Sequence, residues 1–211
     1  MLRSDIFIIL DTAQYSKADF HSRQKIRTNR TEGFTWLQVP VTKQAIALRK
    51  IKISSPASIK NKPWHLRQLD YIQSQYQRAP YFKTFFPDIA QLYQIPTDSL
   101  VDFNLRIINY VKNIAGINTP LLKASALGIT EFLPGSKGVV QICQNLKVNH
   151  YLSGAGAHTQ RTFAAEDFAQ ANITLQWLDF THPVYPQLHQ PFMPNMGVID
   201  ALFCTGRVIF A

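Results

Sequence analysis

A run of small residues follows a short segment, 150–153, that has the pattern of a β-strand. Gly154, Ala155 and Gly156 come directly after it and precede a helical segment. A turn of this kind exposes backbone N–H groups at a helix N-terminus, where phosphates bind. It also falls at the carboxyl end of a strand, where α/β proteins hold ligands. The third glycine of GxGxxG is absent, so a tight turn that only needs small residues is an equal alternative.

A carboxylate stands at the end of another predicted strand. Asp11 follows the apolar segment 5–10. Guanidinium groups near a carboxylate keep it ionised. The ionised carboxylate could hold a hydroxyl or an amine against a phosphate. The alternative is a structural Asp–Arg pair that ties down the following loop. The polar and basic residues that follow Asp11 are Gln14, Tyr15, Lys17, Arg23, Lys25 and Arg27.

The histidines and cysteines predict no metal site. None of the six histidines forms a ligand pair with a clean third ligand. His65, at the start of a predicted helix, is a candidate acid or base near neutral pH, with a local hydrogen-bond network as the alternative. Ser153 lies in no GxSxG motif, which leaves a hydrolase elbow unsupported. Cys143 and Cys204 are expected to be buried free thiols in a reducing compartment.

The overall composition indicates a globular protein. Its 211 residues are 46% apolar and 17% charged, which argues against long disorder. No stretch approaches the roughly 18 uninterrupted apolar residues of a membrane span, and the opening MLRSDIFIILD has no secretory pattern. We therefore expect a cytoplasmic protein without a membrane span. No motif points to a particular cofactor.

The positive charge is concentrated near the start of the chain. The formal net charge is +9, and residues 1–67 hold 13 of the 22 Lys and Arg but only 4 of the 13 Asp and Glu. Such a field suits an anionic ligand: phosphate, a sugar nucleotide, nucleic acid or an acidic membrane face. A solvated basic surface is the alternative. The segment carries no RNP-type signature or zinc knuckle, and its few aromatic residues, Phe20, Phe34 and Trp36, argue weakly for base stacking.

The elements that must position these residues alternate between strand and helix. Strands are predicted at 5–10, 34–41, 120–125, 150–153 and 173–178, with further alternation at 46–53. Helices are predicted at 63–77, 87–93, 98–114 (capped by Thr97 or Asp98), 135–148, 159–171 and 197–206. The segments 12–33, 54–63 and 182–194 are expected to be loops, the first with one helical turn near 19–25. The pattern predicts one α/β domain over 1–211, a three-layer, Rossmann-like, mostly parallel sheet with a helical insertion at about 63–115.

Several strings of the sequence keep a familiar order along the chain. They are FIILDTAQYSKADFHSRQKIRT followed by WLQVPV, then PWHLRQLDYIQSQYQRAPYF, YLSGAGA, HPVYPQ and IDALFCTG. Together they resemble the WbqC-like protein family over nearly the whole chain. Three features depart from that family. Trp64 and His65 are adjacent where the family has Trp-x-x-x-His, and PGSKG lacks the Thr that often follows its Lys. The usual first strand with its Gln-Pro turn is also missing, so the chain resembles an N-terminally shortened member.

The resemblance implies a role in bacterial surface-polysaccharide or O-antigen-type glycoconjugate biosynthesis. It favours a transferase, acyl or aminoacyl, that acts on a nucleotide-linked sugar. Two alternatives stay open: a non-catalytic nucleotide- or nucleic-acid-binding module that uses the basic N-terminal third, and a structural partner in a biosynthetic complex. The partner expected first is an anionic small molecule such as a nucleotide sugar.

The positions that match the family motifs form the predicted site. Asp11, His65 and Ser153 are the catalytic candidates. Lys17, Arg23 and Arg27 are expected to hold phosphate. The full set of predicted substrate-binding residues is Gln14, Tyr15, Lys17, Arg23, Arg27, Tyr151, Gly154, Gly156, His182, Tyr185 and Gln187. Tyr81 and Asp200 also match family positions.

Overall fold

The computed structural model describes residues 1–42, 45–54 and 62–210, and these fall into two units. Unit 1 consists of Met1–Gln14 and Thr119–Thr181. Unit 2 consists of Tyr15–Asn118 and the chain from His182 onward. Most of the segment 54–63, predicted as a loop, lies outside the described residues.

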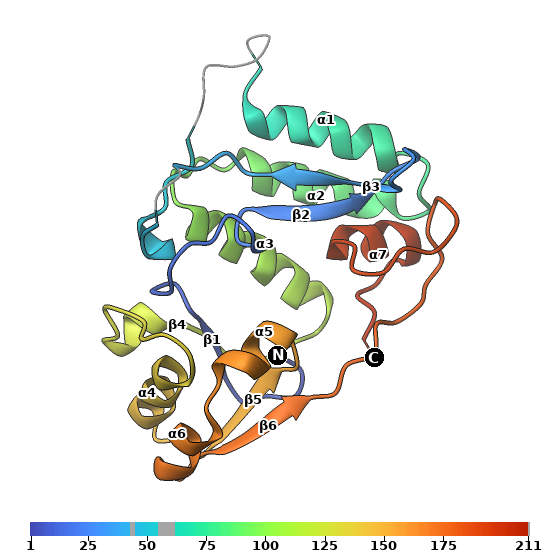
Figure 1. Ribbon diagram of the computed structural model, residues 1–211. Helices are drawn as coiled ribbons and strands as arrows, with labels where there is room; N and C mark the ends of the chain where they lie inside the picture. Colours follow the sequence, from blue (N-terminus) through green and yellow to red (C-terminus); the bar gives the residue numbers. More distant parts are fainter. Residues whose placement is uncertain (43–44, 55–61, 211) are drawn as a thin grey trace. The chain divides into compact units, whose positions relative to one another are not determined.

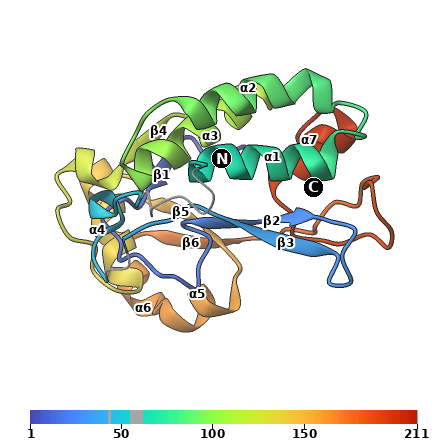
Figure 2. The same cartoon turned by 90° about the horizontal axis from the view of Figure 1, so that it is seen from above.

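Unit 1 is built on two pairs of parallel strands. Strand β1 (Phe7–Ile9) pairs with β4 (Leu121–Lys123), and β5 (His150–Gly154) pairs with β6 (Thr174–Leu178). In both Figure 1 and Figure 2, β1 lies between β4 and β5. The carboxyl ends of β1 and β5 carry Asp11 and Ser153, so the strands place the polar residues singled out from the sequence.

Helices connect these strands. They are the 3₁₀ turn η3 (Ala124–Leu127), α4 (Ser136–Leu146), α5 (Ala157–Thr162) and α6 (Ala165–Gln170). Helices α4 and α6 pack apolar side chains against the strands. Val139 and Cys143 from α4 pack with Phe168 and Ile173 in one buried cluster. The spacing of the apolar residues of α4 puts them on one face, which accounts for this packing.

The single helix predicted at 159–171 is wrong in one respect, because the chain breaks it in two. Phe163 and Ala164 have extended backbones between α5 and α6. The break lets the ring of Phe163 pack against Phe168, with 5.6 Å between ring centroids. It also lets the N–H of Ala164 donate to the hydroxyl of Ser136. Tertiary packing therefore overrides the local helical preference.

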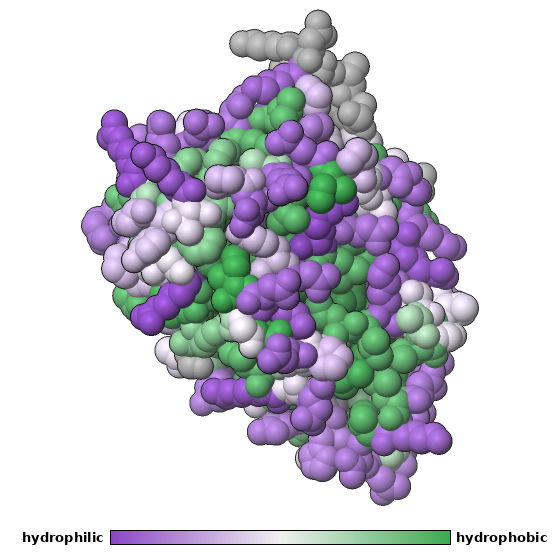
Figure 3. All heavy atoms as spheres, turned by 180° about the vertical axis from the view of Figure 1, so that it is seen from behind, coloured by the Kyte–Doolittle hydropathy of each residue, from purple (hydrophilic) through white to green (hydrophobic). Residues whose placement is uncertain are grey.

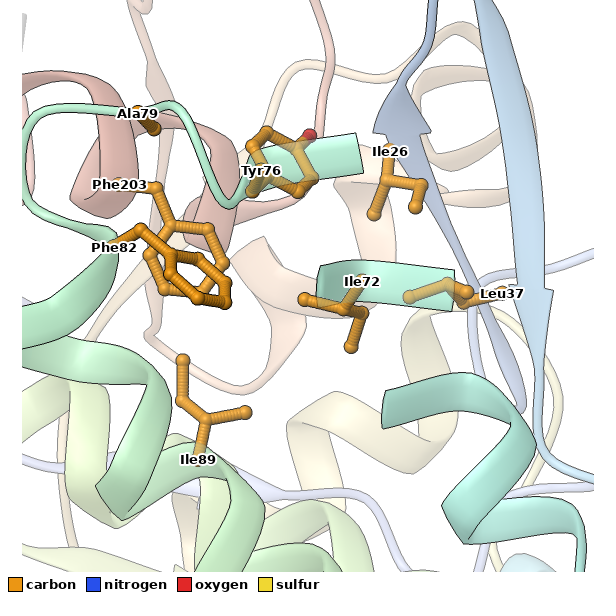
Figure 4. Close-up of a cluster of buried hydrophobic side chains, with 8 residues drawn as sticks. All are labelled: Ile26, Leu37, Ile72, Tyr76, Ala79, Phe82, Ile89 and Phe203. Atoms are coloured by element: carbon orange, nitrogen blue, oxygen red, sulfur yellow. The ribbon is translucent and has the colours of Figure 1, made fainter. Parts of the chain in front are cut away.

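Unit 2 packs a β-hairpin against helices. Strands β2 (Arg23–Arg27) and β3 (Phe34–Gln38) are antiparallel, and Lys25 faces Trp36 in their register. The other elements are the 3₁₀ turn η1 (Leu48–Lys50), α1 (Trp64–Tyr76), α2 (Phe82–Gln94), α3 (Leu100–Ile114) and α7 (Val198–Thr205). Figure 4 shows Ile26 and Leu37 of the hairpin beside Ile72 and Tyr76 of α1. The apolar face of the hairpin thus forms part of the core of unit 2.

Strand β2 corrects the expectation that 12–33 is a loop with a helical turn. The sequence RQKIR carries a single apolar residue, so its alternation is hidden from a hydrophobic pattern. Ile26 supplies the buried side, and charged residues occupy the opposite face. The alternation at 46–53 also does not form a strand. It holds η1 and two isolated bridges, Val41 to Ile53 and Lys52 to Ser99.

Two helix boundaries in unit 2 differ from the predicted ones. Helix α2 begins at Phe82 and contains Pro87, whereas the sequence suggested a start at that proline. The stacked rings of Phe82 and Phe86, 4.4 Å between centroids, hold the first turns in place. Helix α3 is capped by Ser99, whose side chain accepts a hydrogen bond from the N–H of Asp102 at 3.2 Å, and not by Thr97 or Asp98.

The mixed α/β class is thus confirmed. The described strands form three two-stranded sheets, of which two are parallel. In the described part of the chain, no helix has both the length and the apolar character needed to cross a bilayer. The surface visible in Figure 3 carries hydrophilic side chains with hydrophobic ones between them.

Candidate functional site

The carboxylate of Asp11 is held at the end of β1. The backbone N–H of Ser125 donates to Oδ1 at 3.0 Å, and its hydroxyl donates to Oδ2 at 2.5 Å. Asp11 is only 2% exposed. Ser125 lies in η3 directly after β4, the strand that pairs with β1, so the parallel pairing brings the two residues together. A carboxylate that accepts a short hydrogen bond from a hydroxyl can take up that hydroxyl's proton.

The neighbouring hydroxyl of Thr12 is buried without a partner among the described residues. A buried hydroxyl that lacks a hydrogen bond costs about 1–3 kcal/mol, and such atoms call for an explanation. A polar group of a ligand would satisfy it. The sequence reasoning missed both Thr12 and Ser125. Their positions in the sequence could have indicated both residues, because each stands at or just after the end of a predicted strand.

At the end of β5, the glycine turn has no structural need for glycine at its two positions. Gly156 has a φ of −65°, which any residue adopts. Among the described residues, a Cβ on Gly154 would meet no atom within 4 Å, and one on Gly156 would make an ordinary contact with Thr159. The tight-turn explanation therefore does not account for these residues. Glycine also allows another molecule to approach the backbone closely.

Ser153 precedes this turn and is 3% exposed. Its hydroxyl makes a long hydrogen bond of 3.3 Å to the carbonyl of Gly154. Burial raises the pKa of the adjacent Tyr151, and a hydrogen bond with Ser153 lowers it in part. The end of β5 thus offers a buried hydroxyl beside accessible backbone.

In unit 2, the outer face of the hairpin gathers cations and aromatic rings. The guanidinium carbon of Arg23 lies 4.3 Å from the centroid of the Trp36 ring. The ammonium of Lys25 lies 4.4 Å from the Phe34 ring and 5.3 Å from Trp36. Phe20 adds a third ring, 5.8 Å from Trp36. We call these five residues the cation–aromatic face.

Arg27 does not share this environment, although it stands on the same strand. It is 3% exposed, and its guanidinium donates to the carbonyls of Gly33, His189 and Pro191. These bonds tie the turn after β2 to the proline-rich loop. The guanidinium therefore stabilises the fold of unit 2, and its contact with phosphate stays a prediction.

A second buried carboxylate organises unit 2. Asp200 accepts hydrogen bonds from Tyr76 at 2.7 Å, Tyr185 at 2.9 Å and Gln187 at 3.0 Å. The amide of Gln187 also bonds the backbone of Met193 in both directions. Tyr185 and Gln187, predicted to bind substrate, are thus members of a buried network.

The remaining predicted residues have different surroundings. Gln14 and Lys17 are exposed, and the buried Tyr15 hydroxyl lies 2.8 Å from the hydroxyl of Ser22. His65 is half-buried, with its ring edge-to-face with Trp64 at 5.8 Å. His182 accepts the N–H of Asn195 at Nε2, and its Nδ1 lies 2.9 Å from the carbonyl of Pro183.

The two units divide the predicted set between them. Within unit 1 lie the residues at or near the ends of β1 and β5, namely Asp11, Gln14, Tyr151, Ser153, Gly154 and Gly156. Within unit 2 lie Tyr15, Lys17, Arg23, Arg27, His65, His182, Tyr185 and Gln187. The structure brings Tyr185 and Gln187 into direct contact, and it buries Arg27 while Arg23 and Lys25 of the same strand are half-buried.

Neither cysteine has the environment of a nucleophile. Burial and the charge of Asp200 raise the pKa of Cys204 to about 11, and burial raises that of Cys143. Both thiols are buried and free. Across the described residues, no group of three or more His, Cys, Asp or Glu could hold a metal ion.

Comparison with known proteins adds two findings. The model of the WbqC-like protein family matches residues 1–209. The uncharacterized protein Rv1507c of Mycobacterium tuberculosis is 30% identical over 212 aligned residues, which cover 96% of this chain and 84% of that protein. No solved structure matches the chain.

Proposed function

Because the chain belongs to the WbqC-like protein family, we propose that it acts in the biosynthesis of bacterial surface glycoconjugates. In this proposal it is a transferase that places an acyl or aminoacyl group on a nucleotide-linked sugar. We also infer that the parallel pairs β1–β4 and β5–β6 belong to one Rossmann-like layer, an inference supported by the position of β1 between β4 and β5 (Figures 1 and 2).

The observation that carries the proposal is the glycine turn after β5. Gly154 and Gly156 are needed neither for their backbone angles nor for packing, yet they follow a buried hydroxyl at the carboxyl end of a parallel strand. This is where α/β proteins place phosphate-bearing ligands. The backbone of the turn would receive a phosphate of the substrate, and Ser153 would donate to it.

Asp11 supplies the proton acceptor in this scheme. A hydroxyl or amine of the sugar attacks the carbonyl carbon of the donor's acyl group, and the bond from that carbon to the leaving group breaks. The proton of the attacking group passes to Asp11 through the hydroxyl of Ser125, which is hydrogen-bonded to it at 2.5 Å. The leaving group takes its proton from water.

The test is turnover measured by mass spectrometry. The purified chain is incubated with nucleotide-linked amino and hydroxy sugars and with acyl or aminoacyl donors, and the mass added to the sugar is recorded. Gly154→Val is the decisive variant, because its side chain enters open space in the free protein but blocks the backbone from a phosphate. We expect an unchanged melting temperature and at least a tenfold loss of turnover.

Asp11→Asn tests the proton acceptor, with the exposed Asp5→Asn of the same unit as its control. The Asp11 variant should lose turnover, and the Asp5 variant should retain it. If none of the tested sugars gains mass with any donor, the proposed reaction is contradicted. Full activity of Gly154→Val would contradict the assignment of the phosphate to this turn.

A further inference from the structure

We infer that the cation–aromatic face of the hairpin binds a nucleoside diphosphate, with the base against its rings and the diphosphate on Arg23 and Lys25. This inference goes beyond the proposed function: the face, in unit 2, is a binding site separate from the phosphate site proposed at the glycine turn of unit 1. Its physical argument comes from the hairpin alone.

The cations of this face are held in place without an anion. Among the described residues, neither Arg23 nor Lys25 forms an ion pair with a carboxylate, whereas Lys52 pairs with Asp98 and Lys62 with Asp70 elsewhere. Arg23 donates Nη2 to the carbonyl of Ala18, which fixes its guanidinium over Trp36. Two neighbouring positive charges that form no ion pair with a described carboxylate favour a ligand with two negative charges.

The aromatic rings of this face are not core residues. Phe20 is 61% exposed, an unusual state for a phenylalanine, and it lies against Trp36. The core side of the hairpin is formed by Ile26 and Leu37 (Figure 4). Residues of opposite parity, which include Lys25 and Trp36, project from the other side. Among the described elements of unit 2, the helices all lie on the core side of β2 and β3 in Figure 2.

Rings and guanidinium groups together recognise nucleobases. Bases stack on aromatic side chains and on the planes of Arg guanidinium groups, whereas phosphates pair with Arg and Lys. Arg23 offers both a positive charge and a stacking plane, because its guanidinium lies over the Trp36 ring. The exposed ring of Phe20 offers a second stacking surface beside it.

The size of the face favours one nucleotide over a nucleic-acid strand. Binding a strand requires a track of cations and a succession of stacking residues along the backbone. The face offers two cations beside one cluster of three rings, which matches one base and one diphosphate. We therefore commit to a nucleoside diphosphate and leave an oligonucleotide as an outcome of the test.

The experiment is calorimetric titration of the purified full chain with ADP, GDP, CDP and UDP, and separately with pyrophosphate. Phe20→Ala removes an exposed ring, and Lys25→Gln removes a charge; neither removes a buried side chain. The controls are Phe180→Ala, an equally exposed ring in unit 1, and Lys83→Gln, an exposed cation on α2. All variants are checked for an unchanged melting temperature.

We expect one-to-one binding of at least one nucleoside diphosphate. Phe20→Ala should weaken it about tenfold and leave pyrophosphate binding unchanged, whereas Lys25→Gln should weaken both about tenfold. The control variants should bind as the natural chain does. Absence of binding across the panel, or binding that neither variant changes, would overturn the inference. Preferential binding of single-stranded oligonucleotides, growing with length and lost in moderate salt, would overturn it in favour of nucleic acid.

The outcomes also separate this inference from the proposed function. Binding that depends on Phe20 and Lys25, without turnover of any nucleotide sugar, would sustain the inference and contradict the transferase. Turnover of a nucleotide sugar, without any binding of a nucleoside diphosphate that depends on Phe20 and Lys25, would sustain the transferase and contradict the inference.

Discussion

The hydroxyl of Tyr76 donates to the carboxylate of Asp200 across 2.7 Å, although 124 positions separate them in the chain. Both side chains are completely buried. Tyr185 and Gln187 bond the other oxygen of the same carboxylate. These four residues belong to three strings that resemble the WbqC-like family, PWHLRQLDYIQSQYQRAPYF, HPVYPQ and IDALFCTG. The network thus gives these family positions a stabilising role inside unit 2.

Replacing Asp200 by alanine should strongly destabilise the protein. The substitution leaves Tyr76, Tyr185 and Gln187 as buried donors without their acceptor, and each unsatisfied donor costs about 1–3 kcal/mol. We expect the free energy of unfolding to fall by about 4 kcal/mol, measured by urea denaturation. The matched control is Asp88→Ala, because Asp88 also accepts a tyrosine hydroxyl, that of Tyr110 at 3.0 Å, but is exposed. Its cost should stay below about 1 kcal/mol, and equal costs would contradict the role of burial.

Stability should decrease in alkaline solution because of the same network. Burial and the charge of Asp200 raise the pKa of Tyr185 above its ordinary 10.0, and they raise that of Cys204 from 9.0 to about 11. The folded protein keeps these protons while the unfolded chain loses them. Their contribution to stability is therefore complete below about pH 9 and is lost as the pH rises through the raised values.

The measurement is the urea midpoint at pH 8, 9, 10 and 11. We expect it to fall from pH 9 upward, and the fall above pH 10 should be smaller in Tyr185→Phe, which has no phenolic proton to lose. Tyr81→Phe, which removes the hydroxyl of an exposed ring, should follow the natural chain. An identical pH dependence in Tyr185→Phe would show that Tyr185 is not responsible.

Arg27 should matter for stability and not for ligand binding. Its guanidinium donates to Gly33, His189 and Pro191, and no shorter side chain can reach these three carbonyls together. We expect Arg27→Ala to lower the free energy of unfolding by about 3 kcal/mol, since hydrogen bonds from a charged donor are worth about 1.5–3 kcal/mol each before compensation. Urea denaturation measures the loss, and the exposed Arg78→Ala is the control. Weaker pyrophosphate binding by folded Arg27→Ala at undiminished stability would restore the phosphate role.

The periodic parts of the fold could be predicted from the sequence. Helices α1, α4 and α7 and strands β3, β5 and β6 fall within or close to their predicted bounds, because their apolar residues repeat with the period of the element. Strand β2 could not be found this way. Its single apolar residue, Ile26, can be identified as a core residue only through its contact with residues of α1, which are far away in the sequence.

The candidate site also contains some residues that could be predicted from the sequence and others that could not. Asp11 and Ser153 stand at strand ends, a position that sequence spacing reveals, and both do occur there. The partner of Asp11 could not be predicted, because Ser125 reaches it only through the pairing of β1 with β4. Likewise, charge alone could not separate Arg27 from Lys25. The difference arises because carbonyls of the 182–194 loop accept hydrogen bonds from Arg27, whereas the ammonium of Lys25 lies over aromatic rings.

A pair of glycine variants tests how closely the turn at Gly33 packs against the side chains around it. Gly33 and Gly116 both have positive φ, +71° and +65°, so an alanine at either position costs about 1–2 kcal/mol of backbone strain. A Cβ on Gly116 would meet no atom of the described residues within 4 Å, whereas one on Gly33 would clash with the guanidinium of Arg27 and lie 2.7 Å from the terminal methyl of Met193. The guanidinium cannot retreat without breaking its bond to the carbonyl of Gly33. We therefore expect Gly33→Ala to be less stable than Gly116→Ala by at least about 2 kcal/mol in urea denaturation. Equal losses would mean that strain alone acts at both turns and that Arg27 has room to move.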